Sequence, residues 1–139
     1  MSTRRGLDFN MERLIQEDYL DRPWKMTVIC ILLNQTTNQQ VRKILPDLFN
    51  LIKSPSHCTG VNPEEIYPII RSTGFGNVKS KRIVEMSKKW MSGFSDVEEL
   101  PGVGKYAKES WKIFVENEID FVPSDKKLKM YLERINNLN

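Results

Sequence analysis

Apolar residues recur along most of this sequence at the spacing of an α-helix, and Gly or Pro interrupts each run. This periodicity indicates a series of short helices joined by short connections. No sustained alternation of apolar and polar residues bounded by hairpin turns is present, so the pattern does not favour strands. The sequence therefore predicts a compact, all-α fold. The helical pattern covers Met11–Ile15, Trp24–Leu32, Val41–Ile52, Val78–Trp90 and Tyr106–Asn117.

The length and charge of the chain set broad limits on what it does. A chain of 139 residues is within the usual range for one domain, so we expect a single domain over residues 1–139. The 21 Lys and Arg residues against 18 Asp and Glu give a net charge of +3, which by itself does not identify a nucleic-acid-binding protein. Basic residues gather within 79–89, 105–112 and 126–129. This clustering suggests a phosphate-facing side, although a solvated helix face has the same pattern.

Several function classes are excluded by what the sequence lacks. The first ten residues contain no apolar run after their arginines, and no stretch has the length of a membrane span. We therefore expect a soluble, intracellular protein without a membrane partner, located in the nucleus if eukaryotic and otherwise in the cytoplasm or nucleoid. The two cysteines and one histidine are too few for a four-cysteine iron–sulfur cluster and a poor set for zinc. We expect no metal and no cofactor.

The most informative segment is Leu100-Pro101-Gly102-Val103-Gly104-Lys105, where one helix ends and another begins. Without Cβ atoms, Gly102 and Gly104 allow backbone N–H groups to approach a ligand, and the N-terminus of the next helix adds partial positive charge. With Lys105 on the first turn, a DNA phosphate is the natural ligand. Val103 would anchor the turn in the core. The alternative is an ordinary helix-capping loop.

This segment resembles the hairpin of the helix-hairpin-helix DNA glycosylase superfamily, which includes endonuclease III and the adenine-mismatch glycosylases. The resemblance implies a compact helical glycosylase fold with an essential aspartate about one helix after the hairpin, where this chain has Asp125. Cleavage of an N-glycosidic bond places positive charge on the sugar, and a carboxylate stabilises that charge or activates the attacking water. The alternative is that Asp125 only caps the helix that follows it.

The same resemblance bears on whether the DNA strand is also cut. Bifunctional members carry a lysine two residues after the second hairpin glycine, whose amine attacks the sugar. Here that position is Tyr106, and Lys105 lies about 100° away around the helix. A monofunctional enzyme is therefore favoured. A combined glycosylase and abasic-site lyase stays open, because Lys127 is also expected to face the pocket.

A narrower resemblance begins at Leu14–Lys25 and continues at Leu32–Thr37, and it runs to about Tyr131. These segments are similar to the glycosylase domain of the methyl-CpG-binding-domain mismatch-specific thymine/uracil glycosylases. The resemblance implies that three side chains line the base pocket and that two others fill the gap left by a flipped base. Otherwise Gln16 is a surface residue, and Tyr106 and Phe75 are core aromatics. The pocket residues are Gln16, Tyr106 and Lys127; the wedge residues are Gln35 and Phe75.

Together these features predict a monofunctional, monomeric DNA glycosylase of base excision repair. We expect it to bind double-stranded DNA containing a mismatched or damaged pyrimidine. It would remove thymine, uracil or a 5-substituted uracil mispaired with G and leave an abasic site. The alternative from another class is a non-enzymatic helix-hairpin-helix DNA-binding module. That alternative accounts for the hairpin and the lysines but leaves Asp125, Gln16 and Phe75 unexplained.

Overall fold

A computed structural model describes residues 13–137, and every regular element in that range is helical, which confirms the all-α class. Met11, expected in the first helix, lies outside the described residues, and Ile15 belongs to a short 3-10 helix. The elements in chain order are η1 (Ile15–Asp18), α2 (Pro23–Leu32), α3 (Asn38–Leu51), α4 (Pro55–Cys58), α5 (Pro63–Ile70), η2 (Arg71–Thr73), α6 (Gly76–Ser92), η3 (Val97–Glu99), α7 (Lys105–Phe114) and α8 (Lys126–Asn136).

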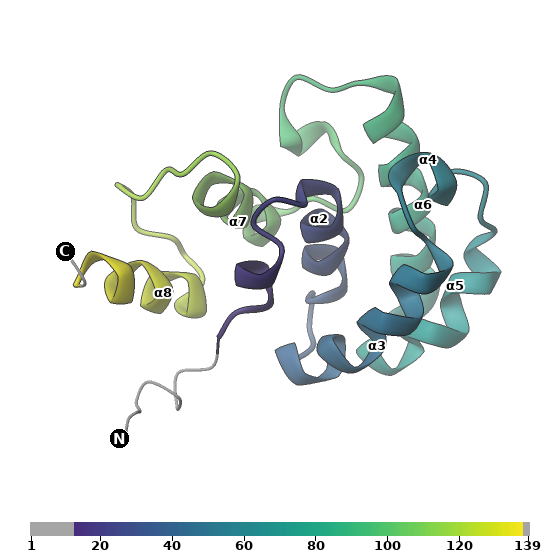
Figure 1. Cartoon of the computed structure of the whole chain (residues 1–139), viewed down its shortest axis with the longest axis horizontal. Helices are drawn as coiled ribbons and strands as arrows, with labels where there is room; N and C mark the ends of the chain where they lie inside the picture. Colours follow the sequence, from purple (N-terminus) through teal and green to yellow (C-terminus); the bar gives the residue numbers. More distant parts are fainter. Residues whose placement is uncertain (1–12, 138–139) are drawn as a thin grey trace.

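Helix α2 is the central element of the molecule. It lies between α3 to α6 on one side and α7 with α8 on the other (Figure 1). Eight of its ten residues are buried, and its apolar side chains point in all directions. A helix that is apolar all round must be covered on every side, so α2 brings the two groups of helices together.

Two hydrophobic clusters meet at α2. The larger one joins α2 to α3, α5 and α6, with Leu48, Ile66 and Met86 among its fully buried side chains. The smaller one joins α2 to α7 and α8, with Ile113 and Leu128 among its buried side chains. We call the two helix groups the large lobe (α3–α6) and the small lobe (α7 and α8). Apart from α2 and its neighbouring turns, the lobes meet where Trp90 of α6 contacts Trp111 of α7, with ring centroids 5.9 Å apart, and elsewhere a cleft remains open between them.

The helix boundaries follow from local chemistry. Asn62 and Asp96 begin α5 and η3 as capping boxes with Glu65 and Glu99, in which each helix start also gains acidic side chains suited to the helix dipole. Helix α7 ends at Phe114, three residues before the predicted end. Asn117 adopts a left-handed conformation (φ 57°) there, and the Glu118 N–H donates back to the Lys112 carbonyl at 2.8 Å. Asparagine tolerates this conformation better than most residues, so it ends the helix early.

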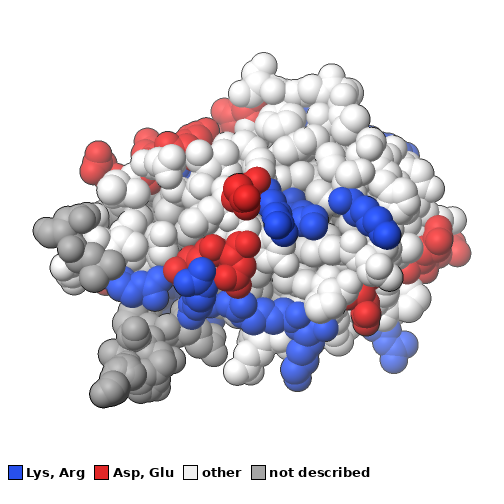
Figure 2. All heavy atoms as spheres, viewed as in Figure 1, with Lys and Arg blue, Asp and Glu red and all other residues white. Residues whose placement is uncertain are grey.

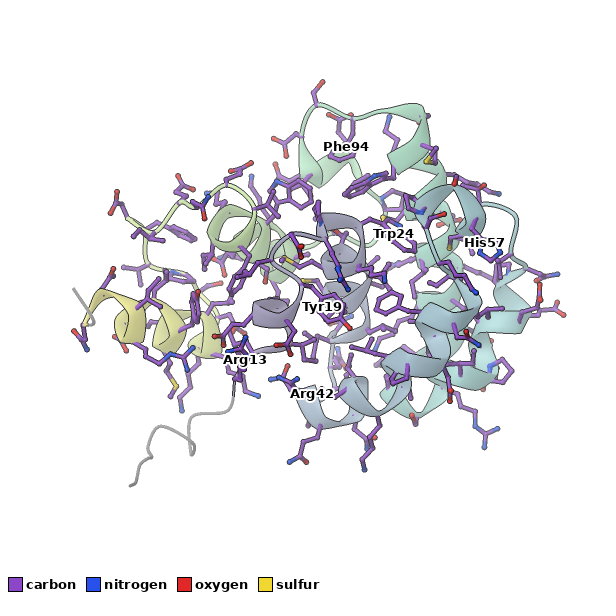
Figure 3. All side chains as sticks on the ribbon, in the orientation of Figure 1. Arg13, Tyr19, Trp24, Arg42, His57 and Phe94 are labelled. Atoms are coloured by element: carbon purple, nitrogen blue, oxygen red, sulfur yellow. The ribbon has the colours of Figure 1, made fainter. Side chains whose placement is uncertain are left out.

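Charged side chains on the face shown in Figure 2 are interspersed rather than segregated. Part of this pattern is a network in which Asp18 accepts hydrogen bonds from Arg13 at 3.0 Å and from Arg42 at 3.1 Å (Figure 3). The paired charges lower the pKa of Asp18 through hydrogen bonds from both arginines, against an opposing contribution from desolvation. No helix within residues 13–137 is long and apolar enough to cross a membrane.

One buried hydrogen bond fixes α2 against α6. The indole N–H of Trp24 donates to the Ser87 hydroxyl at 3.0 Å, and Ser87 donates to the Ile83 carbonyl at 2.8 Å. We predict that Ser87→Ala lowers the free energy of unfolding by about 1–3 kcal/mol, because the indole donor then has no partner. Urea unfolding measures the change. Ser92→Ala, at an exposed serine of the same helix, should change it by about 0.5 kcal/mol or less; equal effects would contradict the assignment.

Candidate functional site

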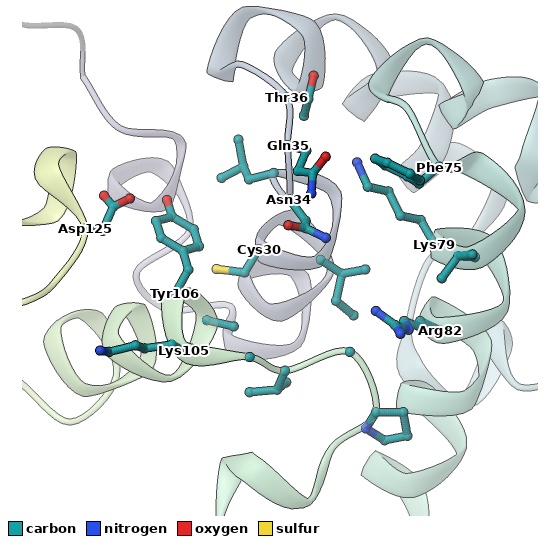
Figure 4. A pocket seen from close by; sticks show the side chains of 18 of the residues that line it. Cys30, Asn34, Gln35, Thr36, Phe75, Lys79, Arg82, Lys105, Tyr106 and Asp125 are labelled. Carbon is teal, nitrogen blue, oxygen red and sulfur yellow. The ribbon is translucent and has the colours of Figure 1, made fainter.

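The cleft between the two lobes has a volume of about 1140 Å³. Its floor is formed by Cys30 and Ile31 of α2, and its walls come from both lobes (Figure 4). All but one of the residues predicted to act on DNA line it, and the exception is Gln16. The residues brought together are Gln35, Phe75, Gly102, Val103, Gly104, Lys105, Tyr106, Asp125 and Lys127.

The hairpin between η3 and α7 forms one edge of the cleft. Gly102 has a φ of 84°, and a Cβ there would lie 3.1 Å from Ile31 Cδ1 and 3.3 Å from Arg82 Cβ. Glycine is therefore favoured at this position by conformation, and an added Cβ would also force the neighbouring side chains to shift slightly. A Cβ on Gly104 would meet nothing within 4 Å, so this glycine leaves open space at the start of α7. Val103 packs against both hydrophobic clusters, as predicted.

The N-terminus of α7 is suited to an anion. Gly104 is its N-cap residue and supplies no side-chain hydrogen bond to the first turn. The unpaired N–H groups and the helix dipole therefore face the cleft edge without a capping side chain. Lys105 is exposed there, whereas Lys108 donates to Glu98 at 2.8 Å. The geometry is compatible with the predicted phosphate site, with Lys105 as its cation.

Asp125 is the N-cap residue of α8 and also lines the cleft. Its Oδ2 accepts a hydrogen bond from the Leu128 N–H at 3.0 Å, so the capping role considered from the sequence is present. Its Oδ1 accepts no hydrogen bond from residues 13–137. One carboxylate oxygen thus holds the helix start and the other is free for a ligand. The two roles do not exclude each other.

Tyr106, which is partly buried, and Gln16, which is fully buried, form a hydrogen-bonded pair beside Asp125. The Gln16 amide donates to the Tyr106 hydroxyl at 2.6 Å and to the Ser110 hydroxyl at 3.2 Å. Gln16 has an exposed fraction of 0%, so it is not the surface residue of the alternative interpretation, and it does not reach the cleft in this conformation. Its Oε1 is buried without a partner among the described residues. Burial raises the pKa of Tyr106, so its phenol stays neutral.

Gln35 and Phe75 occupy the tips of two turns at the other end of the cleft (Figure 4). Both have left-handed backbones, with φ of 59° and 52°. Such a conformation costs roughly 1–2 kcal/mol for a non-glycine residue and persists only where the surroundings impose it. Phe75 has an exposed fraction of 57%, so the alternative that it is a core residue is wrong. Two strained, exposed tips are thus held over one cleft.

The basic residues of the cleft differ from the surface clusters expected from sequence. Lys127 is exposed near the start of α8, and Arg82 is exposed on α6. Lys79, counted with the basic cluster at 79–89, is buried, with an exposed fraction of 2%. Its side chain turns inward because two backbone carbonyls accept its hydrogen bonds. Lys79 is therefore not one of the basic side chains that can face a DNA phosphate.

Glu109 is a site residue that the sequence reasoning missed. It has an exposed fraction of 8% and lies on α7, directly behind the loop that carries Asp125. Its carboxylate accepts hydrogen bonds from the Ser124 N–H at 2.9 Å, the Ser124 hydroxyl at 3.2 Å and the Asp125 N–H at 3.4 Å. The available signal was its spacing, because Glu109 falls in line with Tyr106 and Ile113 on the buried face of the helix.

The cleft residues give little support to thiolate chemistry or to metal binding. Burial raises the pKa of the Cys30 thiol at the cleft floor to about 12, so it is not a thiolate nucleophile near neutral pH. Within residues 13–137, no group of three or more His, Cys, Asp or Glu side chains is placed to hold a metal ion. The ionised groups of the cleft are carboxylates, ammonium groups and a guanidinium.

The fold and the cleft define a helix-hairpin-helix protein with a free carboxylate oxygen opposite two exposed turn tips. The chain belongs to the HhH-GPD superfamily of base excision DNA repair proteins, whose sequence profile matches residues 28–139. This membership confirms the resemblance drawn from the hairpin and Asp125.

Individual relatives agree with this family. A methyl-CpG-binding domain protein 4-like protein of Arabidopsis thaliana is 38% identical over 120 residues, which cover 85% of this chain and 27% of the relative. A thymine/uracil-DNA glycosylase of Pyrobaculum aerophilum is 30% identical over 93 residues, or 61% of this chain and 40% of the relative. An endonuclease III of Thermotoga maritima is 25% identical over 91 residues, or 60% and 43%. The chain thus spans less than half the length of each of these relatives.

Solved structures share the fold. An endonuclease III in a trapped covalent DNA intermediate superposes with a TM-score of 0.63 at 22% identity, over 82% of this chain and 66% of that chain. A non-covalent endonuclease III–DNA complex superposes with a TM-score of 0.60 at 24% identity, over 82% and 55%. The helical arrangement around the cleft is therefore that of endonuclease III.

Glu109 provides a test of how the Asp125 loop is held. We predict that Glu109→Ala lowers the free energy of unfolding by about 1–2 kcal/mol, because the N–H groups of Ser124 and Asp125 lose their charged acceptor. Hydrogen–deuterium exchange should also become faster at residues 124 and 125. Glu116→Ala, at an exposed acid after the same helix, is the matched control. Unchanged exchange at Ser124 and Asp125 would show that another group holds the loop.

Proposed function

We propose that the chain is a monofunctional DNA glycosylase that acts as a monomer on double-stranded DNA. It flips thymine, uracil or a 5-substituted uracil, mispaired with G, out of the helix and cleaves the bond between base and sugar. The product is an abasic site. The substrate class is supported by the similarity to the thymine/uracil-DNA glycosylase of Pyrobaculum aerophilum, whose name gives the bases that it removes.

The observation that carries the proposal is the placement of Asp125 in the same cleft as the hairpin and the two exposed tips. The uncapped start of α7 and Lys105 would hold the phosphate backbone without reading base sequence. Gln35 and Phe75 would enter the base stack and occupy the space of the flipped nucleotide. The flipped sugar would then lie near the free oxygen of Asp125. A protein that only bound the DNA backbone would have no use for this arrangement.

Asp125 would act by stabilising positive charge on the sugar and by accepting a proton from water. As the bond between C1′ and the base nitrogen breaks, the base leaves with the electron pair, and positive charge develops on the sugar. The carboxylate stabilises that charge, and a water molecule adds to C1′ while it gives a proton to an acceptor such as Oδ1. Because Oδ2 remains bonded to the Leu128 N–H, the helix start keeps the carboxylate in place through the reaction.

The base pocket involves the hydrogen-bonded side chains of Gln16 and Tyr106 beside Asp125. An amide side chain offers both a donor and an acceptor, which match the edge of a pyrimidine. Gln16 has an unpartnered Oε1 but does not line the cleft, whereas Tyr106, whose hydroxyl accepts a hydrogen bond from the Gln16 amide, does. The base therefore contacts Tyr106 first and reaches Gln16 only if the phenol moves. Lys127 is exposed, lines the same cleft and is assigned to the base pocket.

Single-turnover cleavage tests the proposed activity directly. Duplexes carry thymine, uracil or a 5-substituted uracil opposite G or opposite A, and alkali reveals abasic sites. We expect cleavage opposite G after alkali treatment. Tight duplex binding with no cleavage of any substrate would favour the non-enzymatic DNA-binding module instead.

We predict that Asp125→Asn lowers the single-turnover rate at least about a hundred-fold while duplex affinity stays within about threefold. The amide can still cap α8 through its oxygen, so folding is preserved, but it carries no negative charge. Asp120→Asn, at an exposed acid of the preceding loop, makes the same change in net charge and should leave the rate unchanged. A rate above a tenth of wild type would remove Asp125 from the mechanism.

A second candidate mode is a combined glycosylase and lyase, because exposed lysines, among them Lys105 and Lys127, line the cleft. The lyase position of the superfamily is Tyr106 here, and its buried phenol cannot form a Schiff base. We predict that borohydride traps no covalent protein–DNA adduct on a substrate that is cleaved after alkali. Endonuclease III on an abasic duplex serves as the positive control. An adduct that disappears in Lys127→Met would establish the lyase mode.

A further inference from the structure

Lys79 is an unusual residue of the large lobe. Its exposed fraction is 2%, and its ammonium donates to the Leu32 carbonyl at 2.7 Å and to the Thr73 carbonyl at 2.9 Å. No carboxylate within residues 13–137 forms an ion pair with it. Burial lowers its pKa to about 8. Placing a lysine in this environment is unfavourable, so its contacts require an explanation.

The two carbonyls belong to the two turns that carry the exposed tips. Leu32 is the last residue of α2 and lies three positions before Gln35. Thr73 is the last residue of η2 and lies two positions before Phe75. Figure 4 shows the Lys79 side chain extending along the cleft wall to the space between Gln35 and Phe75. One ammonium group thus joins two turns that are far apart in sequence.

The Gln35 turn has weak support of its own. The backbone hydrogen bonds from Asn34 to Ile31 and from Thr36 to Leu33 are long, at 3.4 and 3.3 Å. The contact of Lys79 with Leu32 is shorter, and its donor is charged, which makes it the stronger interaction. A left-handed backbone at Gln35 needs such an external constraint.

We propose that Lys79 is a positioning residue that fixes the spacing of Gln35 and Phe75, so that both tips enter the DNA stack together. The inference rests on the proposed function, because the tips matter only if a base is flipped. Two independently mobile turns would have to be ordered when DNA binds, and that ordering opposes insertion. Bridging both turns through one ammonium group orders them before binding.

The experiment compares two substrates in single-turnover reactions of Lys79→Met. Methionine is unbranched and of similar length, so it fills the space but donates no hydrogen bond. We expect excision from a G-mismatched duplex to slow about ten- to a hundred-fold, since small misplacements have effects of this size. Excision of the same base from an unpaired bulge should change by about twofold or less, because less stacking must be broken there. Lys53→Met, an exposed lysine beyond the far end of α3, is the control.

Hydrogen–deuterium exchange gives a readout that does not depend on activity. Faster exchange is expected in Lys79→Met at residues 33–36 and at 73–75 together, with the small lobe unchanged. If wild type cleaves neither substrate, the proposed function fails, and this exchange pattern still tests the bridge. Equal slowing of both substrates, or faster exchange at only one turn, would overturn the inference.

A second variant covers the case in which Lys79→Met does not fold. Lys79→Gln keeps two N–H donors without the charge and has a shorter reach. We expect this variant to fold and to excise the base from the bulge at nearly the wild-type rate. On the duplex, excision should slow, but by less than in Lys79→Met. A loss of the same size on both substrates would again contradict the positioning role.

Discussion

The structure depends on a helix that is apolar on every side. Helix α2 buries Val28 and Leu32 in the large lobe and Met26 in the small one, so both helix groups pack against it. The two lobes are therefore fixed relative to each other mainly through this shared helix, with a further contact between Trp90 of α6 and Trp111 of α7. The cleft lies where they do not meet, and its floor is the side of α2 at Cys30 and Ile31. The same geometry places the turn after Leu32 at the rim of the cleft.

Much of this arrangement could be predicted from the sequence because it depends on local signals. Helical spacing located α2, α3, α6 and α7 to within a few residues. The two hairpin glycines indicated a special turn, and position 102 favours glycine because of its φ of 84° and its close approach to Ile31. Gly104 differs, since its φ is ordinary and the space around it is open. Two glycines in one motif thus have different physical reasons, which spacing alone does not separate.

The remaining features depend on contacts between residues distant in sequence. Gln16 donates to Tyr106 across 90 positions, so its burial follows from the position of α7 and not from its own helical turn. Lys79 donates to the Leu32 carbonyl across 47 positions, and the sequence of α6 alone does not distinguish it from an exposed lysine. Glu109 could be suspected from its place on a buried helix face. Its partners Ser124 and Asp125 become evident only when α8 is placed against α7.

Lys79 and Glu109 have opposite charges, and each holds the backbone of a loop that lines the cleft. Each is buried without an ion-pair partner within residues 13–137, and each is satisfied by backbone groups of a functional loop. A buried charge must keep its hydrogen bonds, so the loop cannot relax without leaving that charge unsatisfied. An apolar side chain would place no such condition on the loop. The loops of Gln35, Phe75 and Asp125 are therefore held by buried charges on neighbouring helices, which define their backbones more sharply than apolar packing would.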